Sequence, residues 1–291
     1  MRRVLAGLIG ANIQKSLAPA LHEDACAAAG MHGLYHLMDL DALPGRTLES
    51  LVDAVRMAGF AGVNVTYPCK EAVLPLLDEV SAEARQIGAV NTVIIDAAGR
   101  TTGHNTDRTG FRRAFADAFG GAAVRDRAAL LVGAGGAGRA VAFALIDLGA
   151  EALLIHDKVA NRADRLAADL RVFCGTDRCR AVADVRRAMA EVAGVVNATP
   201  VGMLGIPGLP IAPDIVAPEQ WVADVIYTPL ETELIKTVRA RGCQVMGGAG
   251  MCVHQAVETF RLFTGVLPDP DRMSRAFAEA AAIREKALVS G

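Results

Sequence analysis

A glycine-rich loop is the first feature of this chain that indicates chemistry. The loop, GAGGAG at residues 133–138, follows a short apolar run and leads into a helical pattern. Gly133 can make the tight turn, Gly135 lets the backbone approach a pyrophosphate, and Gly138 allows the helix to pack closely on the strand. Asp157 ends the next apolar run, at about the 20-residue spacing where an acid meets ribose hydroxyls. We therefore predict a dinucleotide site, and the alternative is a glycine loop that serves only the turn.

Two polar segments nearer the N-terminus are candidates for the reacting groups. They are NVTYPCK at 64–70 and GHNTD at 103–107, and each follows an apolar or extended run. Ligands of open α/β sheets bind outside the carboxyl ends of the strands, so we expect the substrate in a cleft between two domains, facing the nicotinamide. Lys70 and Asp107 are the ionisable candidates, because hydride leaves a carbinol carbon only as the hydroxyl proton departs. The alternative for Lys70 is a solvated surface lysine.

The elements that must position these residues alternate between strand-like and helical patterns. In the first part of the chain, the patterns predict strands at 4–9, 34–40 and 62–65 and helices at 20–29, 47–58 and 71–77. A turn at 97–100 between two extended segments predicts an antiparallel hairpin at the sheet edge. This alternation predicts a sheet covered by helices.

The alternation restarts at residue 130. Predicted strands at 130–132, 153–156, 180–183, 194–197, 222–226 and 244–246 are enough for a six-stranded doubly wound sheet. The glycine- and proline-rich stretch 201–218 is a long loop, and the helical segments 251–264 and 269–289 are expected to pack back on the first domain. We predict a two-domain α/β protein: an N-terminal α/β substrate domain at 1–110, completed by 248–291, and a Rossmann dinucleotide-binding domain at 111–247.

Composition narrows the class of protein. The 291 residues are 52% hydrophobic and 21% charged, which favours two domains over one. The formal net charge is −2 and no Lys/Arg run is interleaved with aromatics, so we expect small-molecule partners and no nucleic acid. No stretch approaches the ~20 apolar residues needed to span a bilayer, so we expect no membrane. The short N-terminal apolar run is interpreted as a buried strand rather than a signal peptide. The six cysteines form no CxxC pair and no ligand spacing with histidine, so no metal and a cytoplasmic location are expected.

Seven motifs, in this order, resemble those of the shikimate dehydrogenase family. They are SLAP (16–19), NVTYPCK (64–70), GAVNT (88–92), GHNTD (103–107), GAGGAG (133–138), NATPVGM (197–203) and GMCVHQA (250–256). The segments 71–81 and 259–269, together with Asp157, look most like the NAD-dependent quinate/shikimate dehydrogenase branch. The resemblance implies an enzyme of the shikimate pathway of aromatic amino acid biosynthesis. It also implies reversible oxidation of the ring hydroxyl at C3 of shikimate or quinate to a ketone.

The resemblance also implies roles for individual residues. Lys70 and Asp107 are the catalytic pair by this resemblance, and the residues implied to hold substrate are Ser16, Thr66, Asn91 and Gln255, with Tyr227 near the substrate carboxylate. The residues implied to bind the cofactor are Gly133, Ala134, Gly135, Gly136, Ala137, Gly138, Asp157, Lys158, Arg162, Asn197, Ala198, Thr199, Pro200, Val225, Gly248 and Met251.

The chemistry of Lys70 and Asp107 is consistent with these roles. Lys70 can donate to a developing alkoxide, and Asp107 can accept from a neighbouring hydroxyl. An ionised Asp107 favours the charged lysine, whereas a general base needs the neutral amine. Lys70 is therefore predicted to be an acid/base or electrostatic catalyst.

The residues after the second Rossmann strand bear on the choice of cofactor. In NADP-dependent members of the family an Asn-Arg-Thr run binds the ribose phosphate, and the matching positions here hold Asp157, Lys158 and Val159. A carboxylate accepts from both ribose hydroxyls of NAD and repels a 2′-phosphate, while Lys158 partly offsets the repulsion. NAD is the predicted cofactor and NADP the less favoured one, with the strictness of the preference left open.

Two departures from the family pattern leave the substrate open. Ala18 stands where the family usually has a second hydroxyl residue near the substrate carboxylate, and Gly247 replaces a frequent aspartate. Shikimate, quinate and a modified ring such as aminoshikimate all stay possible, as do both reaction directions and a monomer or a homodimer. A non-catalytic NAD- or metabolite-binding regulator is the alternative from another class, and the pair of Lys70 and Asp107 argues against it. The NTD and NATPVGM motifs disfavour a methylenetetrahydrofolate dehydrogenase fold.

Overall fold

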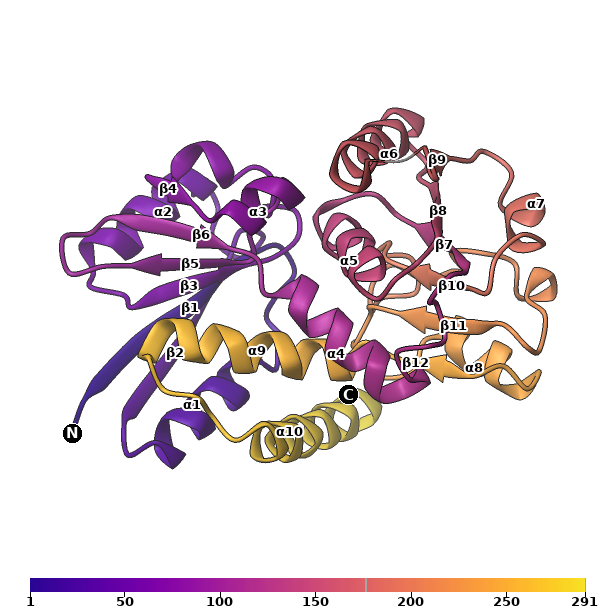
Figure 1. Ribbon diagram of the computed structural model, residues 1–291. Coiled ribbons are helices and arrows are strands. Elements are labelled where there is room, and N and C mark those ends of the chain that lie inside the picture. Colours follow the sequence, from indigo (N-terminus) through magenta and orange to yellow (C-terminus); the bar gives the residue numbers. More distant parts are fainter. Residues whose placement is uncertain (176, 291) are drawn as a thin grey trace. The chain divides into compact units, whose positions relative to one another are not determined.

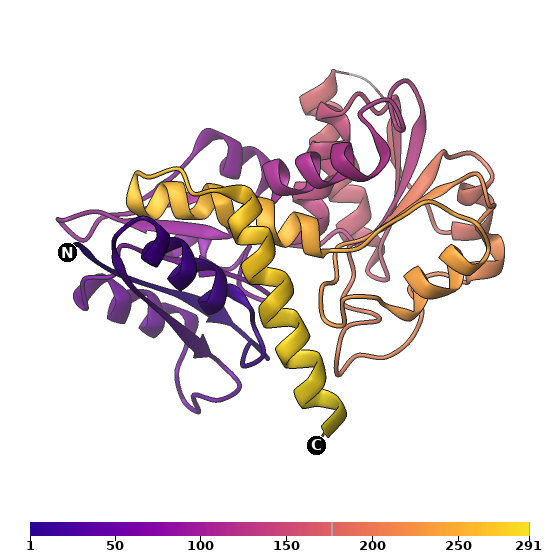
Figure 2. The same ribbon diagram turned by 90° about the horizontal axis from the view of Figure 1, so that it is seen from below.

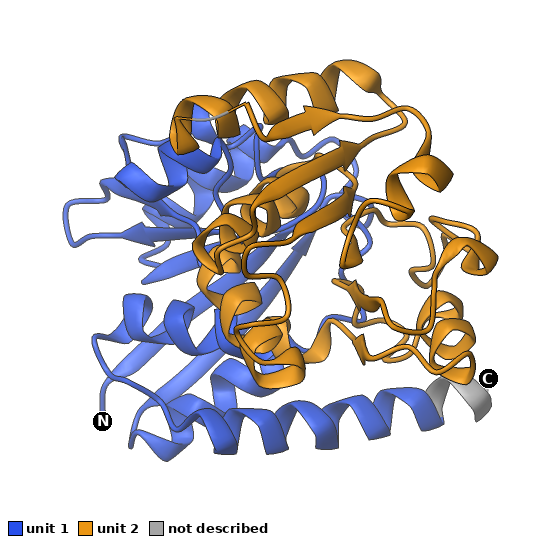
Figure 3. Cartoon of the chain, turned by 45° about the vertical axis from the view of Figure 1, so that its right-hand side comes forward, with its two compact units in different colours: residues 1–106, 253–291 blue, residues 107–252 orange. Residues whose placement is uncertain are grey.

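The computed structural model describes residues 1–175 and 177–290, with side chains up to residue 286. The chain divides into two compact units (Figure 3): unit 1, residues 1–106 and 253–291, and unit 2, residues 107–252. The predicted domain boundaries, after residues 110 and 247, lie close to these divisions. Within the described residues the strands form two sheets of six strands each, one in each unit.

Unit 1 is built on a mixed sheet with the strand order β2-β1-β3-β5-β6-β4 (Figure 1). The strands are β1 (Arg3–Gly10), β2 (His32–Asp39), β3 (Gly62–Val65), β4 (Glu79–Val80), β5 (Thr92–Ile95) and β6 (Thr101–His104). β1 pairs in parallel with β2 and β3, whereas β5 runs antiparallel to both β3 and β6. β3 is buried along its whole length, as expected for a strand with both faces covered.

Helices from both ends of the chain contribute to unit 1. They are α1 (Ala18–Ala28), α2 (Leu48–Met57), α3 (Ala82–Ile87), α9 (Ala249–Thr264) and α10 (Pro270–Ser290), of which α9 begins in unit 2. Thr47 caps α2 in a reciprocal pair with Ser50, which satisfies two backbone N–H groups at the start of the helix. Figure 2 shows α10 beside α1, where Arg272 on α10 forms an ion pair with Asp24 on α1 at 2.8 Å.

Two expectations for unit 1 are wrong. The helix predicted over 71–77 is only a 3-10 turn, η1 (Leu74–Leu76), because Pro75 lacks a backbone N–H and disfavours the helical conformation in the residue before it. The hairpin of β5 and β6 does not lie at the sheet edge, because β4 pairs in parallel with β6 and forms the edge instead. The sequence analysis also missed β4 and α3, which are too short to show a periodic pattern.

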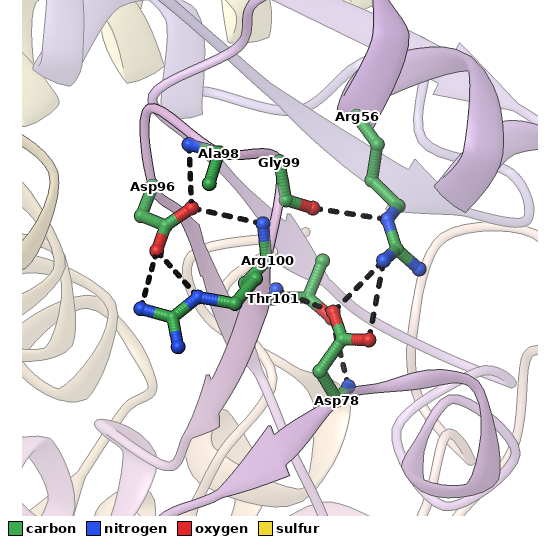
Figure 4. A network of polar contacts seen from close by, with 7 residues as sticks. All are labelled: Arg56, Asp78, Asp96, Ala98, Gly99, Arg100 and Thr101. Atoms are coloured by element: carbon green, nitrogen blue, oxygen red, sulfur yellow. Dashed lines mark hydrogen bonds and ion pairs between the residues drawn. The ribbon is translucent and has the colours of Figure 1, made fainter.

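A carboxylate fixes this edge of the sheet (Figure 4). Asp78 precedes β4, and its Oδ2 accepts from the backbone N–H and the hydroxyl of Thr101, the first residue of β6, both at 2.8 Å. Arg56 on α2 forms an ion pair with Asp78 at 2.9 Å and donates to the Gly99 carbonyl in the hairpin turn at 3.1 Å. The hydrogen bonds from Thr101, with a smaller effect of Arg56, lower the pKa of the Asp78 carboxyl. These contacts tie the β5–β6 turn to α2.

Unit 2 has a fully parallel sheet with the strand order β12-β11-β10-β7-β8-β9. Its strands are β7 (Ala128–Val132), β8 (Ala152–His156), β9 (Cys179–Ala181), β10 (Gly194–Asn197), β11 (Trp221–Asp224) and β12 (Val245–Met246). The order reverses beside β7, as in the doubly wound dinucleotide-binding folds. Each of the predicted strands in this region is therefore present, with bounds shifted by at most a few residues.

The helices of unit 2 cover this sheet (Figure 1). They are α4 (Asp107–Phe119), α5 (Gly136–Asp147), α6 (Ala160–Cys174), α7 (Val185–Met189) and α8 (Glu233–Ala240), with a 3-10 turn η2 (Pro213–Ile215). Phe115 on α4 packs edge-to-face on Trp221 of β11, with ring centroids 4.9 Å apart. Among the described residues, no helix is both long and apolar enough to cross a membrane.

A histidine is buried in unit 1 without hydrogen bonds. His22 on α1 is 4% exposed and stacks on Tyr35 of β2, with ring centroids 4.8 Å apart. Neither ring nitrogen has a hydrogen-bond partner within the described part of the chain. Burial lowers the pKa of this imidazole from 6.5 to about 3, so His22 is neutral in the folded protein.

Acid should destabilise the protein through His22. The unfolded chain binds a proton at His22 below about pH 6.5, whereas the folded chain does so only near pH 3. The contribution of neutral His22 to the free energy of unfolding is therefore complete above pH 6.5 and is lost as the pH falls toward 3. The loss is about 1.4 kcal/mol per pH unit. His22→Phe should flatten the pH dependence of the free energy of unfolding, measured by urea and circular dichroism. His36→Phe, at an exposed position of β2, is the matched control, and equal slopes for wild type and His22→Phe would contradict this assignment.

Candidate active site

The glycine-rich loop connects β7 to α5 in unit 2. Gly133 has a φ of +102°, which favours glycine, and its N–H donates to the His156 carbonyl at 2.7 Å. A Cβ on Gly138 would lie 1.9 Å from the Gly133 carbonyl oxygen, so the loop and the helix are in direct backbone contact. A Cβ on Gly135 would meet nothing within 4 Å, so space is open at the start of α5. This arrangement suits a phosphate on the N-terminus of α5.

Asp157 follows β8 and holds the glycine-rich loop in place. Its Oδ2 accepts from the Ala134 N–H and its Oδ1 from the Val159 N–H, both at 2.8 Å. Each carboxylate oxygen has a second lone pair, so Asp157 can also accept from ribose hydroxyls. Lys158 and Arg162 are exposed beside it, at the start of α6.

A buried carboxyl joins the two loops that follow β10 and β11. Asp224 accepts from Asn197 Nδ2 at 3.1 Å and from the Ile226 N–H at 3.0 Å, and its other oxygen accepts from the Thr232 hydroxyl at 2.8 Å. Asn197 Oδ1 in turn accepts from the N–H and hydroxyl of Thr199, at 3.0 and 2.7 Å. Burial raises the pKa of Asp224, and these donors oppose the shift. Asp224 therefore holds the 197–201 segment and the segment with Tyr227 in one arrangement.

The other candidate cofactor residues lie close to these loops. A Cβ on Gly248 would lie 2.3 Å from the Val225 carbonyl oxygen, and the Gly248 N–H donates to the Ile226 carbonyl at 3.1 Å. Met251 is buried in the first turn of α9. Tyr227 is half-buried between β11 and α8.

In unit 1, Asp39 at the end of β2 shapes the loop that carries Ser16. Its carboxylate accepts from the backbone N–H groups of Asn12 at 3.0 Å, Ile13 at 2.9 Å and Asp41 at 3.0 Å. Burial raises the pKa of Asp39, but these hydrogen bonds and one from Gln14 outweigh it, so the net shift is downward. The Ser16 N–H donates to the Ile13 carbonyl at 2.9 Å, so the position of Ser16 depends on this carboxylate.

The loop with Thr66 lies against the loop with Ser16. The Thr66 N–H donates to the Ile9 carbonyl, and the Ala11 N–H donates to the Tyr67 carbonyl, both at 2.9 Å. A Cβ on Gly10 would lie 2.3 Å from the Thr66 methyl group, so the two loops touch. Two predicted substrate residues, Ser16 and Thr66, are thus carried by neighbouring loops.

The segment 88–92 joins the backbone near Lys70 to the residue before Asp107. The Val90 N–H donates to the Lys70 carbonyl at 2.8 Å. Asn91 Oδ1 accepts from the Thr106 N–H at 2.8 Å, and Asn91 Nδ2 donates to the Thr106 hydroxyl at 2.9 Å. Asp107 follows directly as the buried first residue of α4. The chain around both predicted catalytic residues is therefore fixed by two consecutive residues, 90 and 91.

The structure sorts the predicted site residues between the two units. Ser16, Thr66, Lys70, Asn91 and Gln255 lie in unit 1, and Asp107, Tyr227 and the predicted cofactor residues lie in unit 2. The sequence analysis missed Asp39 and Asp224, whose only signal is an acid that ends a strand-like run. The described residues hold no group of three or more His, Cys, Asp or Glu side chains arranged for a metal ion.

Comparison with known proteins gives consistent matches. Residues 8–93 match the family model of the shikimate dehydrogenase substrate binding domain. The chain is 46% identical over 278 residues to a quinate/shikimate dehydrogenase (NAD(+)) of Corynebacterium efficiens, covering 94% of this chain and 97% of that protein. It is 44% identical to a shikimate dehydrogenase (NADP(+)) of Streptomyces avermitilis, covering 95% and 96% of the two chains.

A solved structure extends the match to three dimensions. Quinate dehydrogenase from Corynebacterium glutamicum in complex with NAD superposes with a TM-score of 0.88 at 43% identity. The superposition covers 96% of this chain and 100% of that chain.

The close backbone contact at Gly138 and the open space at Gly135 predict that these two positions of the loop differ in their tolerance of a side chain. Gly138→Ala should lower the free energy of unfolding of unit 2 by roughly 1–3 kcal/mol, because its methyl group would overlap the Gly133 carbonyl. Gly135→Ala should leave it unchanged, because its φ of −80° suits alanine and the space is open. Urea unfolding followed by fluorescence of Trp221, the single tryptophan, reports on unit 2. Equal stability of the two variants would contradict the close contact.

Proposed function

Because this chain belongs to the shikimate dehydrogenase family, we propose that it is an NAD-dependent oxidoreductase that interconverts shikimate or quinate and the corresponding 3-dehydro ketone. The observation that carries the proposal is the near full-length match to a quinate/shikimate dehydrogenase (NAD(+)) in a chain that has both Lys70 and Asp107. Hydrogen bonds from residues 90 and 91 hold the backbone at Lys70 and before Asp107. Unit 1 would be the substrate-binding domain and unit 2 the dinucleotide-binding domain.

The proposed reaction needs a group that handles the hydroxyl proton. Bound NAD supplies the hydride acceptor, and the glycine-rich loop, Asp157 and the 197–201 segment would hold it. Lys70 would take the C3 hydroxyl proton during oxidation and return it during reduction, or stabilise the alkoxide as a cation. Asp107 would accept from a neighbouring ring hydroxyl and orient the ring.

A polyhydroxy carboxylate also needs directional partners. Ser16, Thr66 and Gln255 would bind its hydroxyl and carboxylate oxygens, with Tyr227 near the carboxylate. Asn91 has an additional task, because both atoms of its amide are bonded to Thr106. It would therefore position Asp107 as well as contact the substrate.

A modified ring is the second candidate substrate. The observation in its favour is Ala18, which offers no hydroxyl in the first turn of α1, while its N–H donates to Ser16 Oγ at 3.2 Å. A substrate such as aminoshikimate is therefore compared directly with shikimate and quinate in the assay below. The retention of Lys70 and Asp107 argues against a non-catalytic regulator, because a binding module needs no proton-transfer group.

The activity assay tests substrate and cofactor together. Purified protein should form NADH from NAD with shikimate or quinate, and more slowly form NADPH from NADP, because Asp157 repels a 2′-phosphate. Asp157→Ser should narrow or reverse this gap in kcat/KM, since Lys158 and Arg162 can then pair with the phosphate. Asp184→Ser, which removes the carboxylate that caps α7, is the matched control.

Two outcomes of this assay would count against the proposal. Turnover with none of shikimate, quinate and aminoshikimate would rule out the proposed activity. Equal kcat/KM values for NAD and NADP in the wild type would rule out the role of Asp157.

Lys70→Ala should separate catalysis from binding. We expect kcat to fall roughly 10²- to 10⁴-fold with a much smaller rise in the KM for substrate, because proton transfer acts in the transition state. Lys236→Ala, an exposed lysine on α8, should leave both parameters unchanged. If Lys70→Ala raised only KM, Lys70 would be a binding residue instead.

A further inference from the structure

A connected group of buried polar side chains crosses the interior of unit 1. Tyr35 donates its hydroxyl proton to Asn64 Oδ1 at 2.7 Å, which fixes the orientation of the Asn64 amide. Asn64 Nδ2 then faces the hydroxyls of Thr92 at 3.1 Å and Thr259 at 3.3 Å. Each of these side chains belongs to a residue that is buried, so water does not compete for its hydrogen bonds.

Thr259 lies at the junction of this group. It belongs to α9 and is 0% exposed. Its hydroxyl lies 3.0 Å from the Thr92 hydroxyl and 3.1 Å from the Thr106 hydroxyl. The hydroxyl oxygens of Thr92 and Thr106 are 3.5 Å from each other, and each lies closer to the Thr259 hydroxyl oxygen. A single hydroxyl from a distant helix therefore joins β5 to the segment before α4.

The two threonine partners of Thr259 both contact residues proposed to bind substrate. Thr92 donates to Asn91 Oδ1 at 3.0 Å. The Thr106 hydroxyl lies 3.4 Å from Gln255 Oε1 and accepts from Asn91 Nδ2 at 2.9 Å. Gln255 and Thr259 are four residues apart on α9, so they lie on the same face of the helix. The side-chain amides of Asn91 and Gln255 thus both contact hydroxyls that lie next to the Thr259 hydroxyl.

We propose that Thr259 is a positioning residue for the reaction, acting through Thr92 and Thr106 on Asn91, Gln255 and the chain at Asp107. The inference rests on the proposed function only in that Asn91, Gln255 and Asp107 act on the substrate. Without the Thr259 oxygen, the hydroxyls of Thr92 and Thr106 keep their hydrogen bonds to Asn91, but each loses its buried contact to Thr259, at 3.0 and 3.1 Å. The Asn91–Thr106 pair then loses its fixed geometry, and the residues that it holds lose theirs.

Thr259→Val tests this with almost no change of shape. We expect kcat/KM for shikimate or quinate to fall roughly 10- to 100-fold, from one or two buried hydrogen bonds left unmade. The KM for NAD should not change, because the loops proposed to bind it lie in unit 2. Thr259→Ser keeps the hydroxyl and should restore most of the activity. Thr259→Cys, with a weak donor of similar size, is tested in the same way if the valine variant does not fold.

Thr264→Val is the matched control on the same helix. Thr264 is also buried, but its hydroxyl donates to the Phe260 carbonyl at 2.7 Å and belongs to no part of this group. The same chemical change there should lower the thermal stability while leaving kcat/KM intact. Equal loss of kcat/KM in both variants, or wild-type kinetics in Thr259→Val, would overturn the proposal.

Hydrogen exchange makes the test independent of the activity. The Thr106 N–H, held by Asn91 Oδ1 at 2.8 Å, should exchange faster in Thr259→Val than in wild type or in Thr264→Val. A wild type inactive on every substrate would refute the proposed function, and faster exchange would still support the positioning by Thr259. Unchanged exchange at Thr106 would refute that positioning whatever the activity.

Discussion

The hydrogen bond from the Thr106 N–H to Asn91 Oδ1 is the interaction on which the arrangement of unit 1 around the candidate site depends. β6 ends at His104 and α4 begins at Asp107, so the backbone between them makes no regular pairing of its own. A buried N–H without a partner is costly, and the Asn91 side chain supplies the partner at 2.8 Å. Together with the buried Asn105, whose Nδ2 donates to the Ala89 carbonyl at 2.9 Å, the Asn91 side chain fixes the path of the chain into α4 and with it the position of Asp107.

In unit 2 the buried acid Asp224 has the role that the Asn91 amide has in unit 1. Asp224 at the end of β11 accepts from Asn197 at the end of β10 and from Ile226 and Thr232 beyond β11. Asn91 directly precedes β5, whereas Asp224 is the last residue of β11. In both units a buried polar residue at the end of a strand thus satisfies the groups of a loop that carries predicted functional residues. Such groups are costly to bury unless every bond is made, so they permit one loop conformation and disfavour the others.

All strands except the two-residue β4 could be predicted because their apolar or extended runs are contiguous in sequence. The glycine-rich loop could be predicted because its requirement for glycine is local. The prediction of a helix over 71–77 was wrong because it relied on the spacing of the apolar residues and gave too little weight to Pro75. The roles of Asp39, Asp224 and Thr259 were missed for a different reason. Each bonds residues that are distant in the sequence, as Thr259 does with Thr92 and Asn64, and no pattern within a single segment encodes such a pairing.

The contact between α9 and β3 explains how a residue so late in the chain comes to hold the candidate site. A Cβ on Gly62 would lie 2.4 Å from the ring of Phe263, so only glycine lets the helix approach the strand this closely. Asn64 lies on the same face of β3 two residues on, and Thr259 lies one helical turn before Phe263. The Phe263–Gly62 contact thus sets the distance between helix and strand, and the bond between Asn64 and Thr259 at 3.3 Å sets the rotation and register of the helix. An apolar contact alone would tolerate a helix turned about its axis, whereas the polar pair holds Gln255 toward Thr106.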